Sequence, residues 1–185
     1  MEPQDRANGD KIKNKHTDDL IDHYWGSISY VSGLIKSSEI KAGLILSFYG
    51  ILLNFAYSYL EMVLNFAKNA IFLYVLLGLW FIAIVVSIYY SVRCFMPRIE
   101  GEYEKNIFFF GDVISKFGNV KEFAKTFHTI SSDEDQLFDQ LGQQIFIISK
   151  IASVKFSYVN KALRFLAIGL LLLLVIIASY LVVSN

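Results

Sequence analysis

Three stretches of the chain are apolar on every side and long enough to cross a membrane. They cover residues 42–60, 69–92 and 165–185, and none of them contains a charged residue. A helix needs about 20 residues to cross a hydrocarbon layer of about 30 Å. Because apolar side chains point in all directions within each stretch, lipid is expected around them. The pattern predicts an all-α integral membrane protein with three transmembrane helices.

The polar parts of the chain show a different pattern, in which apolar positions recur every three or four residues. This spacing predicts an amphipathic cytosolic helix over residues 17–41, capped by Thr17 or Asp18 and running on into the first span. A second helix is predicted to begin at a capping box formed by Ser131 and Glu134 and to continue into the third span. The two amphipathic helices, 18–41 and 135–164, are expected to pack on each other or on further subunits.

Two further segments are defined by polarity and by chain breakers. Residues 1–16 are polar and charged, and disorder is predicted there. Residues 93–164 form the second cytosolic segment, which is predicted to be helical. Pro97 is expected to end the second span helix, and the glycines that follow favour short helices with turns over residues 100–130.

Basic residues next to the spans predict the orientation of the chain. Positive charge gathers before the first span and at both ends of the 93–164 segment, whereas no charge follows the third span. Since cytoplasmic segments carry the excess of Lys and Arg, the N-terminus is expected inside and the C-terminus outside. The residues that carry this asymmetry are Lys36, Lys41, Arg93, Arg98, Lys155, Lys161 and Arg164.

Composition agrees with a membrane protein and excludes several other classes. The chain is 55% hydrophobic, with a mean hydropathy of +0.45, whereas soluble domains are about 45–50% apolar. The formal net charge is zero, so nothing in the overall balance suggests nucleic acid as a partner. Cys94 is the only cysteine, which leaves no internal disulfide.

Catalytic and metal-binding signatures are weak. His16 and His23 could share a helical face, but without a third clear ligand no metal site is predicted. No serine or cysteine has an evident base partner, and there is no phosphate-binding glycine loop or dinucleotide fingerprint. We therefore expect no enzyme, no metal and no cofactor.

The basic residues at the two ends of the 93–164 segment have two interpretations. They can anchor the segment and contact lipid headgroups, or they can form a pocket for a small phosphate-bearing ligand. In the second case Arg98 would be the fork-shaped donor, and the aromatic run 108–110 would provide a stacking surface.

Short motifs in this chain resemble those of the transmembrane effectors of Pycsar anti-phage systems. The segment 39–46 resembles the opening of that family's first span. Pro97-Arg98 and the segment 106–112 resemble its Pro-Arg and Asn-x-x-Phe-Phe-Gly motifs, and residues 144–163 resemble its final helix before the membrane. The resemblance extends over roughly residues 20–180, with the motifs in the same order relative to the spans.

The resemblance implies an activity that composition could not indicate. A partner pyrimidine cyclase would make cyclic CMP or cyclic UMP on infection. The effector would bind this messenger and impair the bacterial inner membrane, so that growth arrests or infection aborts. A cyclic nucleotide needs a cation, a polar group and an apolar surface. The resembling residues that supply these are Arg98, Asn106, Phe109 and Lys155, which are the expected ligand-binding residues.

Assembly and two alternative functions complete the sequence-based expectations. Gly43, Ser47 and Gly50 lie on one side of the first span and would allow close helix packing, so a homo-oligomer is expected. The chain could instead be a constitutive small channel, although its spans offer little polarity beyond Asn54. It could also be a membrane adaptor that recruits a partner through its helices.

Overall fold

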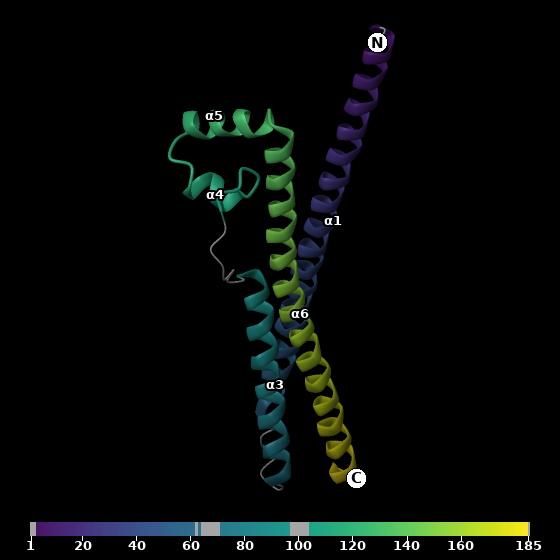
Figure 1. The fold of residues 1–185 in the computed structure, drawn as a ribbon. Helices are drawn as coiled ribbons and strands as arrows, with labels where there is room; N and C mark the ends of the chain where they lie inside the picture. The colour runs from purple at the N-terminus through teal and green to yellow at the C-terminus, as the bar shows by residue number, and fades with distance from the viewer. Residues whose placement is uncertain (1–2, 62, 64–70, 97–103, 185) are drawn as a thin grey trace. The chain divides into compact units, whose positions relative to one another are not determined.

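The computed structural model of the chain describes residues 3–61, 63, 71–96 and 104–184 (Figure 1). No strand occurs in these residues, which confirms the all-α prediction. The helices are α1 (Pro3–Ser58), α3 (Ile71–Phe95), α4 (Phe110–Ser115), α5 (Val120–Ser131) and α6 (Glu134–Ser184).

Three of these helices are long and apolar enough to cross a membrane. They are α1, α3 and α6, and their qualifying segments are His16–Ser58, Ile71–Phe95 and Glu134–Val182. Helix α6 runs without interruption through 51 residues, as predicted for a helix that continues into the third span. Helix α3 ends at Phe95, before Pro97, which lies outside the described residues.

The N-terminal segment differs from its prediction. Helix α1 begins at Pro3, so residues 3–16 are helical where the sequence predicted disorder. A proline is tolerated in the first turn of a helix, and no second proline follows within α1. Extending an existing helix adds one hydrogen bond per residue without a new nucleus, so polar residues can be added to the end of a long helix.

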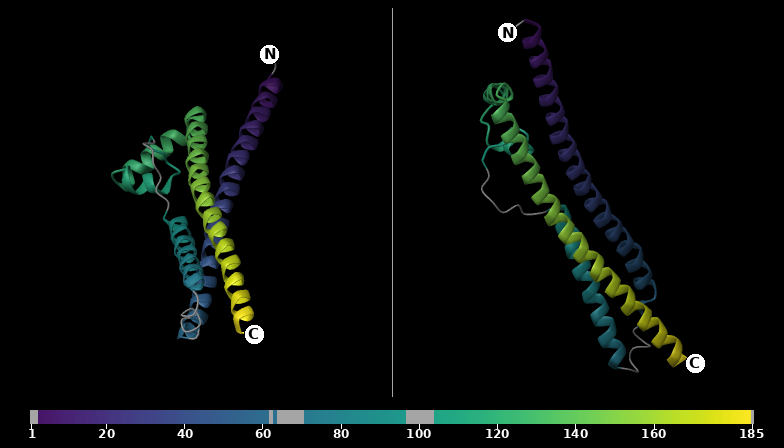
Figure 2. Two further views of the ribbon diagram at one scale, coloured as in Figure 1. Left: turned by 90° about the horizontal axis from the view of Figure 1, so that it is seen from below. Right: turned by 45° about the vertical axis from the view of Figure 1, so that its right-hand side comes forward.

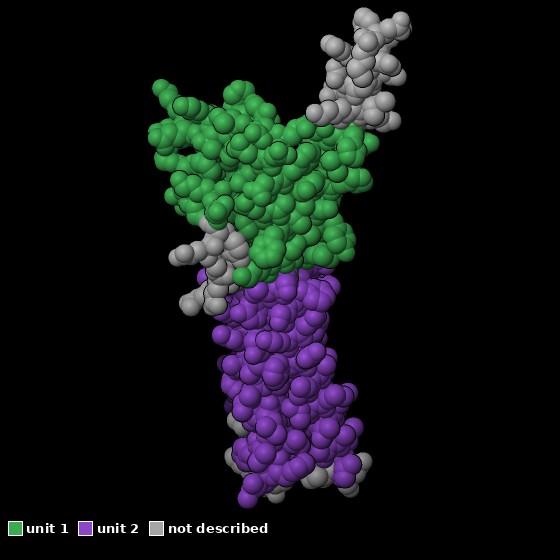
Figure 3. All heavy atoms as spheres, in the orientation of Figure 1, with its two compact units in different colours: residues 1–34, 99–152 green, residues 35–98, 153–185 purple. Residues whose placement is uncertain are grey.

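The chain divides into two compact units, coloured in Figure 3. Unit 1 consists of residues 1–34 and 99–152, and unit 2 consists of residues 35–98 and 153–185. Helices α1 and α6 each contribute residues to both units, whereas α3 belongs to unit 2 and α4 and α5 belong to unit 1.

Unit 2 is a packed group of three helices, in which α3 lies beside α6 in both views of Figure 2. Its outward surface is rich in exposed large apolar side chains, such as Leu44 and Leu171. Since this surface needs an apolar solvent, unit 2 has the character of a membrane-embedded unit. The buried cluster at its centre contains Ala42, Ile45, Tyr49, Ile84, Cys94, Val159 and Ala162.

The close helix packing in unit 2 occurs between α3 and α6. Ala83, Ser87 and Ser91 are spaced four residues apart on α3. The Ser87 hydroxyl donates a hydrogen bond of 2.8 Å to the carbonyl oxygen of Ala162. A Cβ placed on Gly169 would lie 3.8 Å from that of Ala83. Small residues at this spacing let two backbones approach closely in lipid.

The sequence also predicted close helix packing at Gly43, Ser47 and Gly50 of α1, as part of a homo-oligomer. A Cβ on Gly50 would meet no atom within 4 Å, and one on Gly43 would meet only the tip of the Phe95 ring at 3.9 Å. Ser47 is also exposed. The small residues of α1 therefore allow close approach on a side that this chain leaves largely open.

Unit 1 joins the first part of α6 to α1, α4 and α5. The Tyr24 and Phe138 rings lie 5.4 Å apart, and the Thr17 hydroxyl donates to Glu134 at 3.0 Å. These contacts join α1 and α6 within unit 1. The cap of α6 differs from the prediction, because Ser131 still belongs to α5. Asp133 accepts the backbone N–H of Gln136 at 3.1 Å instead.

Candidate functional site

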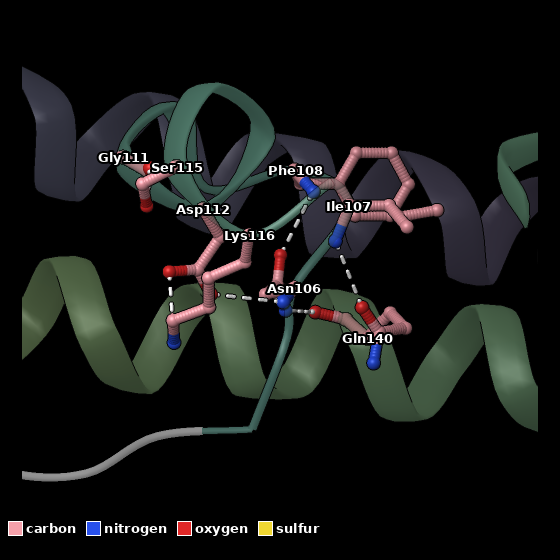
Figure 4. A network of polar contacts seen from close by, with 8 residues as sticks. All are labelled: Asn106, Ile107, Phe108, Gly111, Asp112, Ser115, Lys116 and Gln140. Carbon is pink, nitrogen blue, oxygen red and sulfur yellow. Dashed lines mark hydrogen bonds and ion pairs between the residues drawn. The ribbon is translucent and has the colours of Figure 1, made fainter. Parts of the chain in front are cut away.

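A buried network of polar contacts in unit 1 is built around the Asn106 side chain (Figure 4). Asn106 is fully buried, and its amide is hydrogen-bonded at both ends. Its Nδ2 donates to the carbonyl oxygen of Gln140 at 2.7 Å, and its Oδ1 accepts the backbone N–H of Phe108 at 2.8 Å. One side chain thus fixes the loop before α4 against α6.

Two further side chains complete this network. The Gln140 Oε1 accepts the backbone N–H of Ile107 at 2.9 Å, and the Asp112 Oδ2 accepts that of Asn106 at 3.0 Å. The buried Asp112 also pairs with Lys116 at 3.0 Å. Buried backbone N–H groups outside a helix need such acceptors, because leaving one unpaired is costly.

Phe109 follows the network and forms the start of α4. Phe109 is the N-cap residue of α4 and has an extended backbone conformation. Its carbonyl oxygen accepts the backbone N–H groups of Asp112 and Val113, both at 3.0 Å. A Cβ on Gly111 would lie 2.9 Å from the Phe109 ring, so only glycine fits under it without a shift.

The neighbouring ring, Phe108, has a structural role. It contacts Trp25 of α1 edge-on at 5.6 Å and Phe127 of α5 at 6.0 Å. Phe109 is half-buried and has no ring partner among the residues that the structure describes. Of the two rings, Phe109 is therefore the one without an aromatic partner in the described residues.

A buried acceptor also lacks a partner in unit 1. The Oε1 atom of Gln144 is buried and has no hydrogen-bond partner within the described part of the chain. Gln144 lies one helical turn after Gln140, on the same side of α6. In the sequence, the signal for this site is the occurrence of two glutamines among the apolar positions of the predicted helix.

Lys155 lies in unit 2, where it joins three helices. It is only 5% exposed. Its Nζ donates to Glu39 of α1 at 2.6 Å and to the carbonyl oxygen of Cys94, in the last turn of α3, at 2.9 Å. A cation at a helix C-terminus interacts favourably with the helix dipole. The Lys155 ammonium therefore holds α1 and the end of α3 against α6.

The four expected ligand-binding residues thus fall into three groups. Asn106 and Phe109 are neighbours in unit 1, joined by a backbone hydrogen bond of 3.3 Å. Lys155 belongs to unit 2, with Glu39 as its partner. Arg98 lies outside the described residues. No group of three His, Cys, Asp or Glu side chains suited to a metal ion occurs among the described residues.

The fold defines a class, a helical membrane protein with three spanning helices and a polar helical unit on the same chain. Comparison with known proteins then identifies the family. The Pycsar effector protein domain matches residues 23–182, and the chain belongs to this family. This confirms the resemblance inferred from the short motifs. Membership supports an anti-phage effector role, in a family that is not a known enzyme class.

Two relatives are similar over most of their length. The Pycsar effector protein PtPycTM of Propioniciclava tarda is 25% identical over 159 residues, which is 84% of this chain and 77% of that protein. The Pycsar effector protein SaPycTM of Staphylococcus aureus is 30% identical over 141 residues, or 76% of this chain and 84% of that protein. No solved structure matches the chain.

Proposed function

We propose that this chain is a membrane effector that binds cyclic CMP or cyclic UMP and then impairs the bacterial inner membrane. A partner pyrimidine cyclase would make the nucleotide during phage infection, and the resulting membrane damage would arrest growth or abort infection. The observation that carries the proposal is the family match over residues 23–182, which includes all three long apolar helices and the polar network of unit 1.

The proposed topology puts unit 1 in the cytoplasm, where the nucleotide is made. It rests on the excess of Lys and Arg before the first span and around residues 93–164. A reporter that is active only in the cytoplasm should be silent when fused after Asn185 and active when fused before Met1. Activity from the C-terminal fusion would contradict three spans with the N-terminus inside.

Within the proposed nucleotide site, the residues have different tasks. Arg98 binds the phosphate, since a planar fork pairs well with two phosphate oxygens. Phe109 stacks on the base, and Asn106 acts by holding the loop that presents Phe109. A phosphate could reach Lys155 only by replacing the Glu39 carboxylate, which occupies it at 2.6 Å. Binding of the phosphate to Lys155 would then break its ion pair with Glu39 and so release α1.

Nucleotide binding must favour a damaging state over a resting one. A ligand shifts such an equilibrium only by its difference in affinity for the two states. Moving a population from about 1% to about 99% active requires about 10⁴-fold tighter binding to the active state. The effector should therefore be inactive when expressed without nucleotide.

The test is the membrane potential of bacteria that express the chain, with and without added cyclic CMP or cyclic UMP. Loss of potential is expected only with one of the nucleotides, and cyclic AMP serves as the control. Loss of potential without any nucleotide would instead favour a constitutive channel. An unchanged potential in all cases, with the protein present in the membrane, would contradict the proposed function.

The phosphate contact is tested by calorimetry on Arg98→Ala and Arg98→Lys in purified full-length protein. Losing a charge-assisted hydrogen bond costs about 1.5–3 kcal/mol, which weakens affinity about tenfold to a hundredfold. Lys125→Ala is the matched control, because it removes an exposed cation from α5. If Arg98→Ala binds nucleotide as tightly as this control, Arg98 is not part of the site.

Assembly is the remaining part of the proposal. The open side of α1 at Gly50 could receive a helix of a second copy, and three spans with so little polarity do not enclose a conducting path alone. Gly50→Leu should reduce nucleotide-dependent damage while insertion is retained, whereas Gly26→Leu is the control in unit 1. Full damage by a chain that remains monomeric with nucleotide would contradict this assembly.

A further inference from the structure

In unit 2, the cations of Arg93 and Lys161 lie over aromatic rings at one height along the helices, called here the Arg93 level. The Arg93 guanidinium of α3 lies 5.5 Å from the centre of the Tyr158 ring and donates to its hydroxyl at 3.3 Å. The Lys161 ammonium of α6 lies 5.5 Å from the Tyr90 ring centre and 6.0 Å from that of Tyr158. Two cations from two helices therefore share one pair of tyrosines.

The rings themselves form a continuous stack along the α3/α6 junction. Tyr90 of α3 stacks on Tyr158 at 6.2 Å and on Phe165 at 6.0 Å, both from α6. All three rings are half-buried, so their edges and faces remain partly open to the outside. Such a stack fixes the positions of the cations that lie over it.

These cations differ from Lys155 in having no counter-ion. Lys155 is paired with Glu39, whereas neither Arg93 nor Lys161 has a carboxylate partner among the described residues. Lys161 is exposed and Arg93 is partly so. The Arg93 Nε is buried and one of its Nη atoms donates to Tyr158, so the other Nη of Arg93 and the Lys161 ammonium are the donors left for an anion.

The position of this level along the helices indicates which anion is nearby. From Arg93 to Ile71 is about 33 Å of helix, and from Lys161 to Tyr180 about 28 Å, at a rise of 1.5 Å per residue. Both lengths match a hydrocarbon layer of about 30 Å. Basic and aromatic side chains at the end of such a length mark the membrane interface, where lipid phosphates lie.

The opposite end of the same helices supports this assignment. Tyr57, Tyr59 and Tyr74 are exposed there, as expected for a second aromatic girdle. A third pair, Lys41 over Phe156 at 5.8 Å, lies at the same end of α1 as the Arg93 level. Three basic residues therefore lie over aromatic rings around the Arg93 level.

We propose that Arg93 and Lys161 form a binding site for the phosphodiester headgroup of an anionic phospholipid, on the outer surface of the α3/α6 junction. The Tyr90–Tyr158 stack holds the two cations toward the headgroup, and the exposed apolar side chains below it contact the acyl chains. This site is separate from the proposed nucleotide site, and the inference stands whether or not the chain responds to a nucleotide.

The experiment measures binding of a fluorescent phosphatidylglycerol to the purified full-length chain in mixed micelles, with phosphatidylcholine as competitor. Wild-type protein should prefer phosphatidylglycerol. Arg93→Ala/Lys161→Ala should reduce that preference about 30-fold. Each basic residue near an anionic lipid surface strengthens binding about fivefold, and the two factors multiply. Arg93→Lys/Lys161→Arg should retain most of the preference, because both charges remain.

The matched control is Lys121→Ala/Lys125→Ala, which removes two exposed cations from α5 and should leave the lipid preference unchanged. Circular dichroism checks that each variant is folded. If the double alanine variant does not fold, Lys161→Ala alone is used, because Lys161 is exposed and makes no hydrogen bond in the described structure.

Two results would overturn the proposal. One is an unchanged phosphatidylglycerol preference in the folded Arg93/Lys161 variants. The other appears in a parallel titration with cyclic CMP and cyclic UMP: if nucleotide affinity falls in these variants while the lipid preference stays, the phosphate that the site binds belongs to a soluble nucleotide. Loss of lipid preference with normal nucleotide binding supports the lipid site.

Discussion

Unit 1 and unit 2 stabilise buried backbone polar groups in different ways. In unit 1 the loop before α4 leaves N–H groups outside any helix, and the side chains of Asn106, Asp112 and Gln140 accept or donate the missing bonds. In unit 2 the backbone groups are mostly hydrogen-bonded within the helices. Polar side chains add single hydrogen bonds, such as that of Ser87 between two helices and that of Lys155 to the end of α3.

The difference shows what each unit can change without unfolding. A loop held by three buried side chains can be altered locally, because few side chains determine its position. Packed spanning helices can change from one arrangement to another only if the few polar contacts between them can break and form with other partners. The Lys155–Glu39 pair is such a link, and Glu39 is partly accessible, with 40% of its side chain exposed. Four predictions test this contrast, from the largest expected effect to the smallest.

Asn106→Leu should have the largest effect, confined to unit 1. Leucine has a similar size but leaves the Phe108 N–H without an acceptor and the Gln140 carbonyl without its donor. Buried unsatisfied groups cost about 1–3 kcal/mol each, so about 3 kcal/mol of local stability should be lost. Hydrogen exchange over residues 104–116 should accelerate strongly.

The control for this variant is Asn54→Leu, which changes an exposed amide of α1 in unit 2. It should leave exchange in both units unchanged. If Asn106→Leu accelerates exchange in α3 as much as in the 104–116 loop, the two units do not behave as separate parts and the contrast fails.

Lys155→Met should destabilise unit 2 by a smaller amount. It removes the cation from Glu39 and from the end of α3. Breaking a fully buried pair costs about 3–5 kcal/mol, and the partial exposure of Glu39 reduces the expected loss to about 2 kcal/mol. Thermal unfolding in detergent measures the loss, and Lys155→Met/Glu39→Met should recover part of it.

Lys36→Met is the matched control, because Lys36 is an exposed cation of α1 in unit 2. It should unfold like the wild-type chain. Equal melting temperatures for Lys155→Met and Lys36→Met would show that the buried ion pair does not hold the three helices together.

Asn119→Ala should loosen α5 and nothing else. The Asn119 side chain accepts the backbone N–H groups of Lys121 and Glu122, both at 3.0 Å, and caps the helix. Losing such a cap costs about 1 kcal/mol. Faster exchange of those two amides is the expected result, whereas Asn119→Asp should keep the cap. Equal exchange in Asn119→Ala and Asn119→Asp would contradict the capping role.

The smallest effect is expected at acid pH, at the start of α6. The backbone N–H of Gln136, followed by its side-chain amide, holds the pKa of Asp133 below its usual value. A carboxylate with a lowered pKa in the folded state stabilises that state above its unfolded pKa. This contribution is lost as pH falls through the folded pKa.

The carboxyl carbon shift of Asp133, followed by NMR, should therefore titrate below the usual range for aspartate. Asp133→Asn, which keeps a capping acceptor without the charge, should remove the acid sensitivity of the first turn of α6. Titration of Asp133 at its ordinary value would show that the cap does not bind the charged form in solution.

The sequence by itself determined the helical class, the three spans and the family. These follow from local properties: uninterrupted apolar runs give the spans, and a spacing of three to four residues gives the amphipathic helices. The continuity of α6 was also predictable, because no proline or strong breaker interrupts residues 134–184. The short motifs indicated the family because their order relative to the spans is itself a pattern along the chain.

Only the tertiary structure decided what the individual polar residues do. Asn106 and Gln140 are 34 residues apart, and Lys155 and Glu39 are 116 apart, so no periodicity connects them. The glycines of α1 indicated one close-packing surface, and only the structure shows a second one, where α3 packs on α6 through alanine, serine and a single glycine. Which small residues face a neighbour depends on helix rotation, and that is fixed by packing of the whole unit.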